Sequence, residues 1–184
     1  MTIRFAAVTI LVCIGCALPA PALAQGGSDY RGDYTAGVNL FDSVRNRGET
    51  TTYSPGWFAG ASYRIIPVIS LVGEMAGDYN KEAGTSFYLY TFSGGARFQS
   101  GSKSARLRPF AQVLMGTGMD NGSVGQSPTK NHFPVVTPGG GIDLALTKHL
   151  AGRLKLDFPL YATFGDVHKG IRMSLGISMP VGTR

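Results

Sequence analysis

Three histidines are the side chains with the greatest capacity for catalysis or metal binding in this sequence. His132, His149 and His168 fall in three separate segments that we expect to connect strands. No two of them are spaced i, i+2 or i+4, and the expected topology places His149 at the opposite end of the fold from the other two. Because metal ligands and a Ser–His pair must converge, we expect no metal site, no catalytic histidine and no cofactor.

Glu74 and Asp78 are the nearest approach to a carboxylate pair for acid–base chemistry. Four residues apart on one strand, their Cα atoms would be roughly 13 Å apart. That separation is wide for a retaining pair of carboxylates. We therefore expect structural ion pairing at these positions.

Both cysteines, Cys13 and Cys16, lie in an N-terminal segment with the features of an export signal. Arg4 supplies a positive charge, residues 5–14 are apolar, and Ala22-Leu23-Ala24 is a small-x-small site. We predict a signal peptide over residues 1–24 that is cleaved after Ala24. The alternative is a lipoprotein signal, with Cys16 as the lipidated residue. Cleavage after Ala24 leaves a mature chain without a thiol.

The charge and composition of the chain argue against a nucleic-acid partner and against disorder. The formal net charge of +6 falls to +5 when Arg4 is removed with the signal peptide. The cations are scattered and form no run of Lys and Arg, as a nucleic-acid footprint would. Aromatic residues at 10% and hydrophobic residues at 43% are too abundant for a disordered chain.

The mature sequence alternates between apolar and polar residues. In residues 170–181, Ile171, Met173 and Leu175 begin a row of apolar residues at odd positions, whereas Arg172 and Ser174 begin the opposite row. This period of two predicts a strand with one apolar face. The same pattern marks residues 57–63, 71–79, 88–98, 111–115, 142–146 and 154–160, and less cleanly 34–44. No run of 18 apolar residues follows residue 24, so the pattern predicts eight strands and no membrane-spanning helix.

Longer and shorter connections alternate between these eight segments. The expected connections are 43–55 (long), 65–68 (tight), 80–86 (medium), 100–105 (short), 119–132 (long), 147–149 (tight) and 163–169 (medium). An even number of strands with short turns on one side and longer loops on the other is typical of an outer-membrane barrel.

The composition of the polar face of the strands favours the lumen of a barrel over the solvent-exposed face of a sandwich. It carries small residues together with long charged residues of both signs, which suit a narrow interior. The charges are Arg64, Glu74, Asp78, Arg97, Arg108, Asp143, Arg153, Lys155, Asp157 and Arg172. We predict that they form a structural ion-pair network that plugs the lumen. The alternative is that several of them lie at the rims and are solvated.

Aromatic residues near the strand ends predict girdles at two membrane surfaces. These residues are Tyr34, Trp57, Tyr63, Tyr79, Tyr88 and Tyr161. Lipid leaves no partner for an unpaired strand edge, so eight strands must close on themselves. The predicted fold is all-β: an eight-stranded antiparallel up-and-down transmembrane β-barrel over residues 34–182, after a short linker over 25–33.

Several short motifs resemble the OmpA-like outer-membrane β-barrel family, in particular its small single-domain porin-family members. They are Pro55-Gly56-Trp57, Pro109-Phe110-Ala111, Gly139-Gly140-Gly141-Ile142-Asp143, Arg153 with Asp157, and Arg172-Met173-Ser174-Leu175-Gly176-Ile177. The resemblance implies a barrel in the bacterial outer membrane, inserted by the assembly machinery, with membrane lipid and lipopolysaccharide as its surroundings. The chain ends Met179-Pro180-Val181-Gly182-Thr183-Arg184, without the terminal aromatic residue usual in such barrels.

Three functions remain open at the level of sequence. The favoured one is a monomeric structural or surface-interaction barrel whose loops 43–55 and 119–132 bind an unknown ligand. The second is a narrow channel or small-ligand carrier. The third is a lipid A-modifying enzyme, but the His-x-Ser motif of the deacylases is absent, because His132, His149 and His168 are each followed two residues later by Pro, Ala or Gly. We therefore expect no enzymatic activity.

Overall fold

The computed structural model describes residues 31–44, 50–82, 85–100, 105–124, 127–147, 149–163 and 166–182. The predicted signal peptide, Cys16 and all but the last three residues of the predicted linker lie outside the described residues. Within the described part of the chain, no helix has the length and hydropathy needed to cross a membrane.

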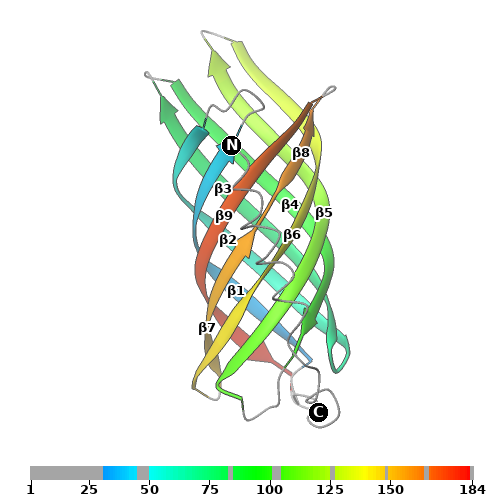
Figure 1. Ribbon diagram of the computed structural model, residues 1–184. Coiled ribbons are helices and arrows are strands. Elements are labelled where there is room, and N and C mark those ends of the chain that lie inside the picture. The colour runs from blue at the N-terminus through cyan, green and yellow to red at the C-terminus, as the bar shows by residue number, and fades with distance from the viewer. Residues whose placement is uncertain are drawn as a thin grey trace, which may run out of the picture.

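The described residues form one antiparallel sheet of nine strand segments that closes into a barrel (Figure 1). The segments are β1 (Gly32–Val44), β2 (Thr50–Ile66), β3 (Ile69–Glu82), β4 (Thr85–Gln99), β5 (Leu107–Val124), β6 (Ser127–Thr147), β7 (Leu150–Asp157), β8 (Leu160–Thr163) and β9 (Asp166–Val181). Consecutive strands pair from β1 to β7, β8 pairs with β6 and β9, and β1 pairs with β9 from Gly32↔Val181 to Val44↔Lys169. This last pairing closes the barrel and leaves no free sheet edge.

β7 and β8 occupy a single position in the barrel. Both pair with β6 on one side and with β9 on the other, and the register of β7 continues without a shift into β8. The ladder is interrupted where Pro159 lacks an N–H group. The Phe158 N–H still donates to the Pro138 carbonyl at 2.8 Å, and Gly170 N–H donates to the Pro159 carbonyl at 2.9 Å. The prediction of an eight-stranded antiparallel barrel is therefore confirmed.

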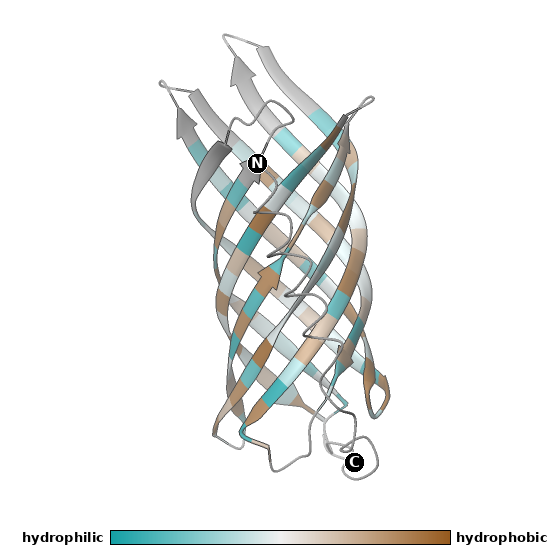
Figure 2. Ribbon diagram, viewed as in Figure 1, coloured by the Kyte–Doolittle hydropathy of each residue, from teal (hydrophilic) through white to brown (hydrophobic). Residues whose placement is uncertain are grey.

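The alternation of the sequence separates two surfaces of the barrel. Along β9, Arg172, Ser174 and Ser178 are buried inside, whereas Met173, Leu175 and Ile177 are exposed on the outside. Figure 2 shows this alternation as teal and brown bands along the strands. Because side chains of a strand point alternately to opposite faces, the polar row lines the lumen and the apolar row covers the outer wall.

The connections differ between the two ends of the barrel. At the end where β1 begins and β9 ends, which we call the terminal end, β2 and β3 are joined through Pro67 and Val68 alone. At the opposite end, the far end, the predicted long loops are wrong in extent. β5 and β6 remain paired as far as Val124↔Ser127, and β1 and β2 as far as Val44↔Thr50. Segments rich in Gly, Asn, Ser and Thr are typical of loops, and the prediction relied on that composition. A ladder of backbone hydrogen bonds needs no apolar side chains once its register is set, so such segments can also form a hairpin.

Candidate functional site

The lumen at the terminal end is organised by Arg153 of β7. Its guanidinium makes a two-pronged contact with Asp143 of β6, from Nε to Oδ1 at 2.6 Å and from Nη2 to Oδ2 at 2.9 Å. The remaining nitrogen, Nη1, donates to Asp33 Oδ1 at 3.1 Å and to Thr35 Oγ1 at 2.8 Å, both on β1. The planar fork of an arginine matches a carboxylate in this way, so one side chain joins three strands.

Asp33 is a second centre of this cluster. Ser62 Oγ donates to Asp33 Oδ2, and Ser178 Oγ donates to Asp33 Oδ1 at 3.2 Å. The Arg97 guanidinium approaches Asp33 at 3.6 Å. Sequence reasoning missed this residue because it fell in the expected linker, whereas β1 begins at Gly32, two residues before the predicted start of the barrel. Its odd position, shared with Thr35 and the other inward residues of β1, is the signal that could have found it.

Gln112 of β5 connects the terminal-end cluster to the middle of the lumen. Its amide oxygen accepts from Arg97 Nε and Nη2 at 3.2 and 3.1 Å, and its Nε2 donates to Asp157 Oδ1 at 3.2 Å. There Lys155 Nζ lies 2.6 Å from both oxygens of Glu74 and 3.0 Å from Asp157 Oδ2. Buried charges need this degree of pairing, because an unpaired ion in the interior is very costly.

Among the predicted lumen cations that the structure describes, Arg172 of β9 lies nearest the far end. It donates to Asp78 Oδ2 at 2.7 Å and to the Tyr161 hydroxyl at 3.4 Å. Asn39 Nδ2 donates to the other oxygen of Asp78. Glu74 and Asp78 thus have separate cationic partners, as the expectation of structural ion pairing requires.

Three phenylalanine rings fill the lumen between the charges, and the sequence pattern did not single them out for this position. Arg97 and Arg153 lie 4.8 and 5.1 Å from the centre of the Phe110 ring. Lys155 Nζ lies 4.5 Å from the centre of Phe58, and the Arg172 guanidinium lies 5.2 Å from the centre of Phe41. The negative face of an aromatic ring attracts such desolvated cations. Each ring could have been found from its odd or even position in the sequence, since that position lies on the polar face of its strand.

Inward glycines provide the space for these rings. A Cβ atom at Gly141 would lie 2.8 Å from Phe110, and one at Gly37 or Gly176 would lie 2.7 or 2.8 Å from Phe58. The narrow interior of an eight-stranded barrel is therefore filled by pairing large and small residues across it.

The structure brings most of the predicted lumen charges together and leaves two of them at the mouth of the lumen, its opening at the terminal end. Eight are joined in the contacts above: Glu74, Asp78, Arg97, Asp143, Arg153, Lys155, Asp157 and Arg172. Arg64 and Arg108 lie at the terminal end, half-buried, where they line a pocket of about 20 Å³ with Asp33 and Asp143. The alternative of a rim position therefore applies to these two arginines.

The predicted girdle aromatics divide into outward residues and one inward residue. Tyr34 and Tyr63 are exposed near the terminal end. On the outer face nearer the far end, Trp57 Nε1 donates to the Tyr79 hydroxyl at 2.6 Å, and Tyr79 meets Tyr88 edge to face. The assignment of Tyr161 to a girdle is wrong.

Tyr161 lies inside the barrel, 4% exposed, between the rings of Phe41 and Phe133. The physical reason is parity, since the register continues through Pro159 and odd positions of β7 and β8 face the lumen.

The histidines occupy different elements from those expected. His149 lies in the turn between β6 and β7, but His132 is on β6 opposite Met119 and His168 is on β9 opposite Tyr161. The placement of these two in connections is wrong because the far-end hairpins extend further than their composition indicates. Among the residues described, no three His, Cys, Asp or Glu side chains are grouped to hold a metal ion.

Solved structures identify the architecture. No family model matches the sequence, and no curated protein is similar to it in sequence. The structure is similar to Neisserial surface protein A, with a TM-score of 0.71 and 15% identity over 85% of this chain and 100% of the other. It is also similar to Ail, the attachment invasion locus protein of Yersinia pestis, with a TM-score of 0.63 and 12% identity over 84% of this chain and 100% of the other.

The N-terminal β-barrel domain of Pseudomonas aeruginosa OprF is a third similar structure, with a TM-score of 0.56 and 13% identity over 84% of this chain and 100% of that domain. The chain has the fold of a small outer-membrane β-barrel. At these identities the likeness establishes the architecture, and the individual role of the chain rests on its own residues.

Proposed function

We propose that the chain is a bacterial outer-membrane β-barrel with a plugged lumen and a structural or surface-interaction role, without catalysis. The supporting observation is the inversion of its two surfaces. Met115 and Leu175 are 63% and 61% exposed on the outer wall, whereas Lys155 and Asp157 are 1% and 0% exposed inside. A continuous exposed apolar surface marks a membrane or protein interaction site, and lipid is the surrounding that matches an apolar wall on every strand. The location of the similar structures in outer membranes supports the same proposal.

The difference between the two ends supports an orientation. Outer-membrane barrels have short turns in the periplasm and longer hairpins outside, so the terminal end faces the periplasm and the far end faces the medium. The β5–β6 hairpin continues nine residues from the exposed Val136 to Ser127, about 30 Å along a strand. Figure 1 shows this hairpin projecting at the far end. Such an arm is available to lipopolysaccharide or to a surface ligand, and insertion is assigned to the outer-membrane assembly machinery.

The filled lumen argues for a plug and against a channel. Large side chains such as Leu114 and Arg153 are fully buried there, and the mouth pocket of about 20 Å³ has room for about one water molecule. Ion pairs cross the lumen from β1 to β7, between Asp33 and Arg153, and from β3 to β9, between Asp78 and Arg172. An eight-stranded barrel has an interior just wide enough for its side chains.

Cell fractionation and electrophoresis test the proposal. We expect the expressed chain in the outer-membrane fraction, and we expect the unheated protein to migrate faster than the boiled protein, because a closed barrel resists detergent. Planar bilayers containing the purified barrel should show no conductance steps, and lipid A from cells with and without the chain should have the same mass spectrum. A soluble periplasmic protein would contradict the location, steady conductance would contradict the plug, and a change in lipid A would contradict the absence of catalysis.

A further inference from the structure

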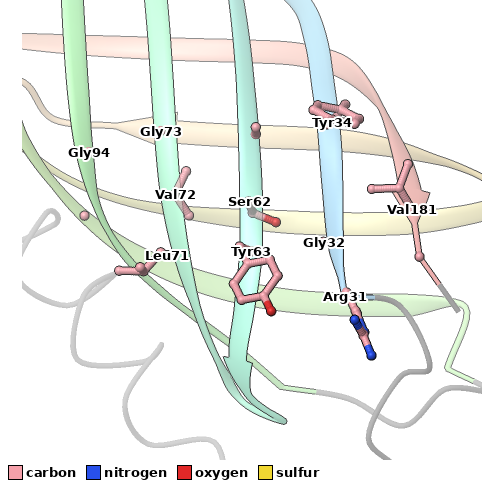
Figure 3. A pocket seen from close by; sticks show the side chains of 13 residues that line it. Arg31, Gly32, Tyr34, Ser62, Tyr63, Leu71, Val72, Gly73, Gly94 and Val181 are labelled. Carbon is pink, nitrogen blue, oxygen red and sulfur yellow. The ribbon is translucent and has the colours of Figure 1, made fainter. Parts of the chain in front are cut away.

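A groove of about 680 Å³ crosses the outer wall near the terminal end (Figure 3). Its floor is formed by Ala61 on β2, Gly73 on β3 and Gly94 on β4, which are direct neighbours in the sheet register. The residue beside Ala61 in the same row is Tyr34 of β1, and Tyr63 and Leu71 form the next row toward the terminal end. The groove is thus an apolar depression bordered by the larger side chains of Tyr34, Tyr63 and Leu71.

The two floor glycines are not required by the packing of the barrel. A Cβ atom at Gly73 would have no heavy atom within 4 Å, and one at Gly94 would meet only the Val72 carbonyl at 3.5 Å. Inward glycines differ, because a Cβ atom at Gly95 or Gly116 would collide with the backbone of the adjacent strand. The empty space above Gly73 and Gly94 therefore lies outside the barrel, where it can hold another molecule.

Polar groups lie at one edge of the groove. Figure 3 shows the Tyr63 hydroxyl and the Arg31 guanidinium on the side of the terminal end. The backbone of Arg31 is fixed, since its N–H donates to the carbonyls of Val181 and Gly182 at 3.1 Å and its carbonyl accepts from Arg64 N–H at 2.7 Å. Its side chain is exposed, and within the described part of the chain no carboxylate lies within ion-pair distance of it. An arginine in this position presents a fork of donors that suits a phosphate.

We infer that the groove binds a phospholipid of the periplasmic leaflet, with an acyl chain on the Ala61–Gly73–Gly94 floor and an anionic headgroup at Arg31. The inference rests on the proposed membrane location and orientation. Basic residues at a membrane surface bind anionic headgroups, and tyrosines such as Tyr63 are placed at headgroup level by their mixed polarity. Phosphatidylglycerol fits better than phosphatidylcholine, because its headgroup has no cationic group to place beside the Arg31 guanidinium.

A second copy of the chain fits the groove less well than a lipid does. In a two-fold pair the same patch meets itself, so both copies would bring Arg31 to the same level of the membrane. The described carboxylate nearest in sequence to Arg31 is Asp33, which faces inward and accepts a hydrogen bond from Arg153. The charge at the groove edge therefore favours an anionic lipid.

Native mass spectrometry of the full barrel tests the inference. The protein is reconstituted with equal parts of phosphatidylglycerol and phosphatidylcholine, released into detergent, and the lipids retained per barrel are counted. We expect the unchanged protein to retain phosphatidylglycerol preferentially. The double variant Gly73→Leu/Gly94→Leu should fold, since both Cβ atoms fit, and should lose the retained lipid. Arg31→Gln should still retain lipid but lower the preference for phosphatidylglycerol by about fivefold, the effect of one cation at an anionic surface.

Matched variants separate the groove from general effects. Gly152 is an outward glycine of β7 at the same end, where a Cβ atom would meet only the Leu146 side chain at 3.8 Å. Gly152→Leu and Arg106→Gln should retain lipid as the unchanged protein does. Retention of phosphatidylglycerol by the filled double variant would overturn the inference, and so would a two-barrel mass that the double variant loses. The unchanged protein and every variant are first checked for heat-modifiable migration. A failure of the unchanged protein to insert contradicts the proposed function, whereas unchanged retention in an inserted variant contradicts only the groove.

Discussion

Arg153 illustrates how one side chain joins distant parts of the chain. Its contact with Asp33 spans 120 positions of sequence, and its fork holds Asp143 through two bonds. Removing two ions from water costs several kcal/mol for each, and only close geometry with further hydrogen bonds offsets that cost. Here Gln99 Nε2 also donates to Asp143 Oδ2 at 2.8 Å, which satisfies the outer side of the same carboxylate.

Replacement of Arg153 should destabilise the barrel strongly. Arg153→Met leaves Asp143 buried without its cation, and we expect a loss of about 3–5 kcal/mol in the free energy of unfolding. Urea unfolding in vesicles, followed by the fluorescence of Trp57, the single tryptophan, measures this. The double variant Arg153→Met/Asp143→Asn should recover part of the loss, and the exposed Arg106→Met should change stability by less than about 0.5 kcal/mol. An Arg153→Met barrel as stable as the unchanged one would show that the ion pair contributes nothing.

At the scale of the strand, β9 shows the row of apolar side chains that covers the outer wall. Its outward positions are Ile171, Met173, Leu175, Ile177, Met179 and Val181, all exposed. The row begins near the far end and finishes at the terminal end, so its members lie at different depths of the proposed membrane. The cost of a charge on the wall should therefore depend on position along the strand.

A charge introduced on this row should report its depth. Leu175→Arg, near the middle of the strand, should lower the free energy of unfolding in vesicles by about 2–4 kcal/mol, because the guanidinium meets hydrocarbon. Val181→Arg, at the terminal end, should cost about 0–1 kcal/mol, because the side chain reaches the interface. The two variants carry the same change on the same strand and control for each other. Equal costs at both positions would be inconsistent with a membrane around this wall.

At the scale of the whole molecule, the contact between the first and last strands defines the structure. β1 and β9 pair over the full length of β1, from Gly32↔Val181 to Val44↔Lys169. Before this pairing forms, both strands have unsatisfied backbone groups that lipid cannot satisfy. The barrel is therefore a single closed unit whose register at the closure determines every lumen contact of β1.

A cross-strand disulfide should form at this closure. Ala36 and Ile177 are register partners on the outer face, so Ala36→Cys/Ile177→Cys should oxidise in the folded monomer. The link encloses a loop on the order of 100 residues and should raise the free energy of unfolding by about 4 kcal/mol where its geometry is unstrained. Reduced and oxidised samples are compared by urea unfolding. Ala36→Cys/Met173→Cys, four positions out of register, should stay reduced; its ready oxidation would show a different closure.

Much of the fold could be predicted because strand patterning is local. The alternation in residues 170–181 assigned each side chain of β9 to its face, and the predicted tight turn at 65–68 lies between β2 and β3. Composition misled where it was used in place of parity. Tyr161 was assigned to a girdle because it is aromatic and near a strand end, and the Gly-, Asn- and Ser-rich segment 119–132 was assigned to a loop although most of it is paired.

The sequence by itself determined which residues form strands and which face of each strand is apolar, because a period of two is a property of the extended backbone. Only the tertiary structure decided the partners of each charge, the phenylalanine rings that separate the charges, and the groove above Gly73 and Gly94. These depend on the register between strands and on the closure of β1 against β9, which bring together residues such as Asp33 and Arg153 from opposite ends of the chain. A register is a property of pairs of strands, so no single segment of sequence contains it.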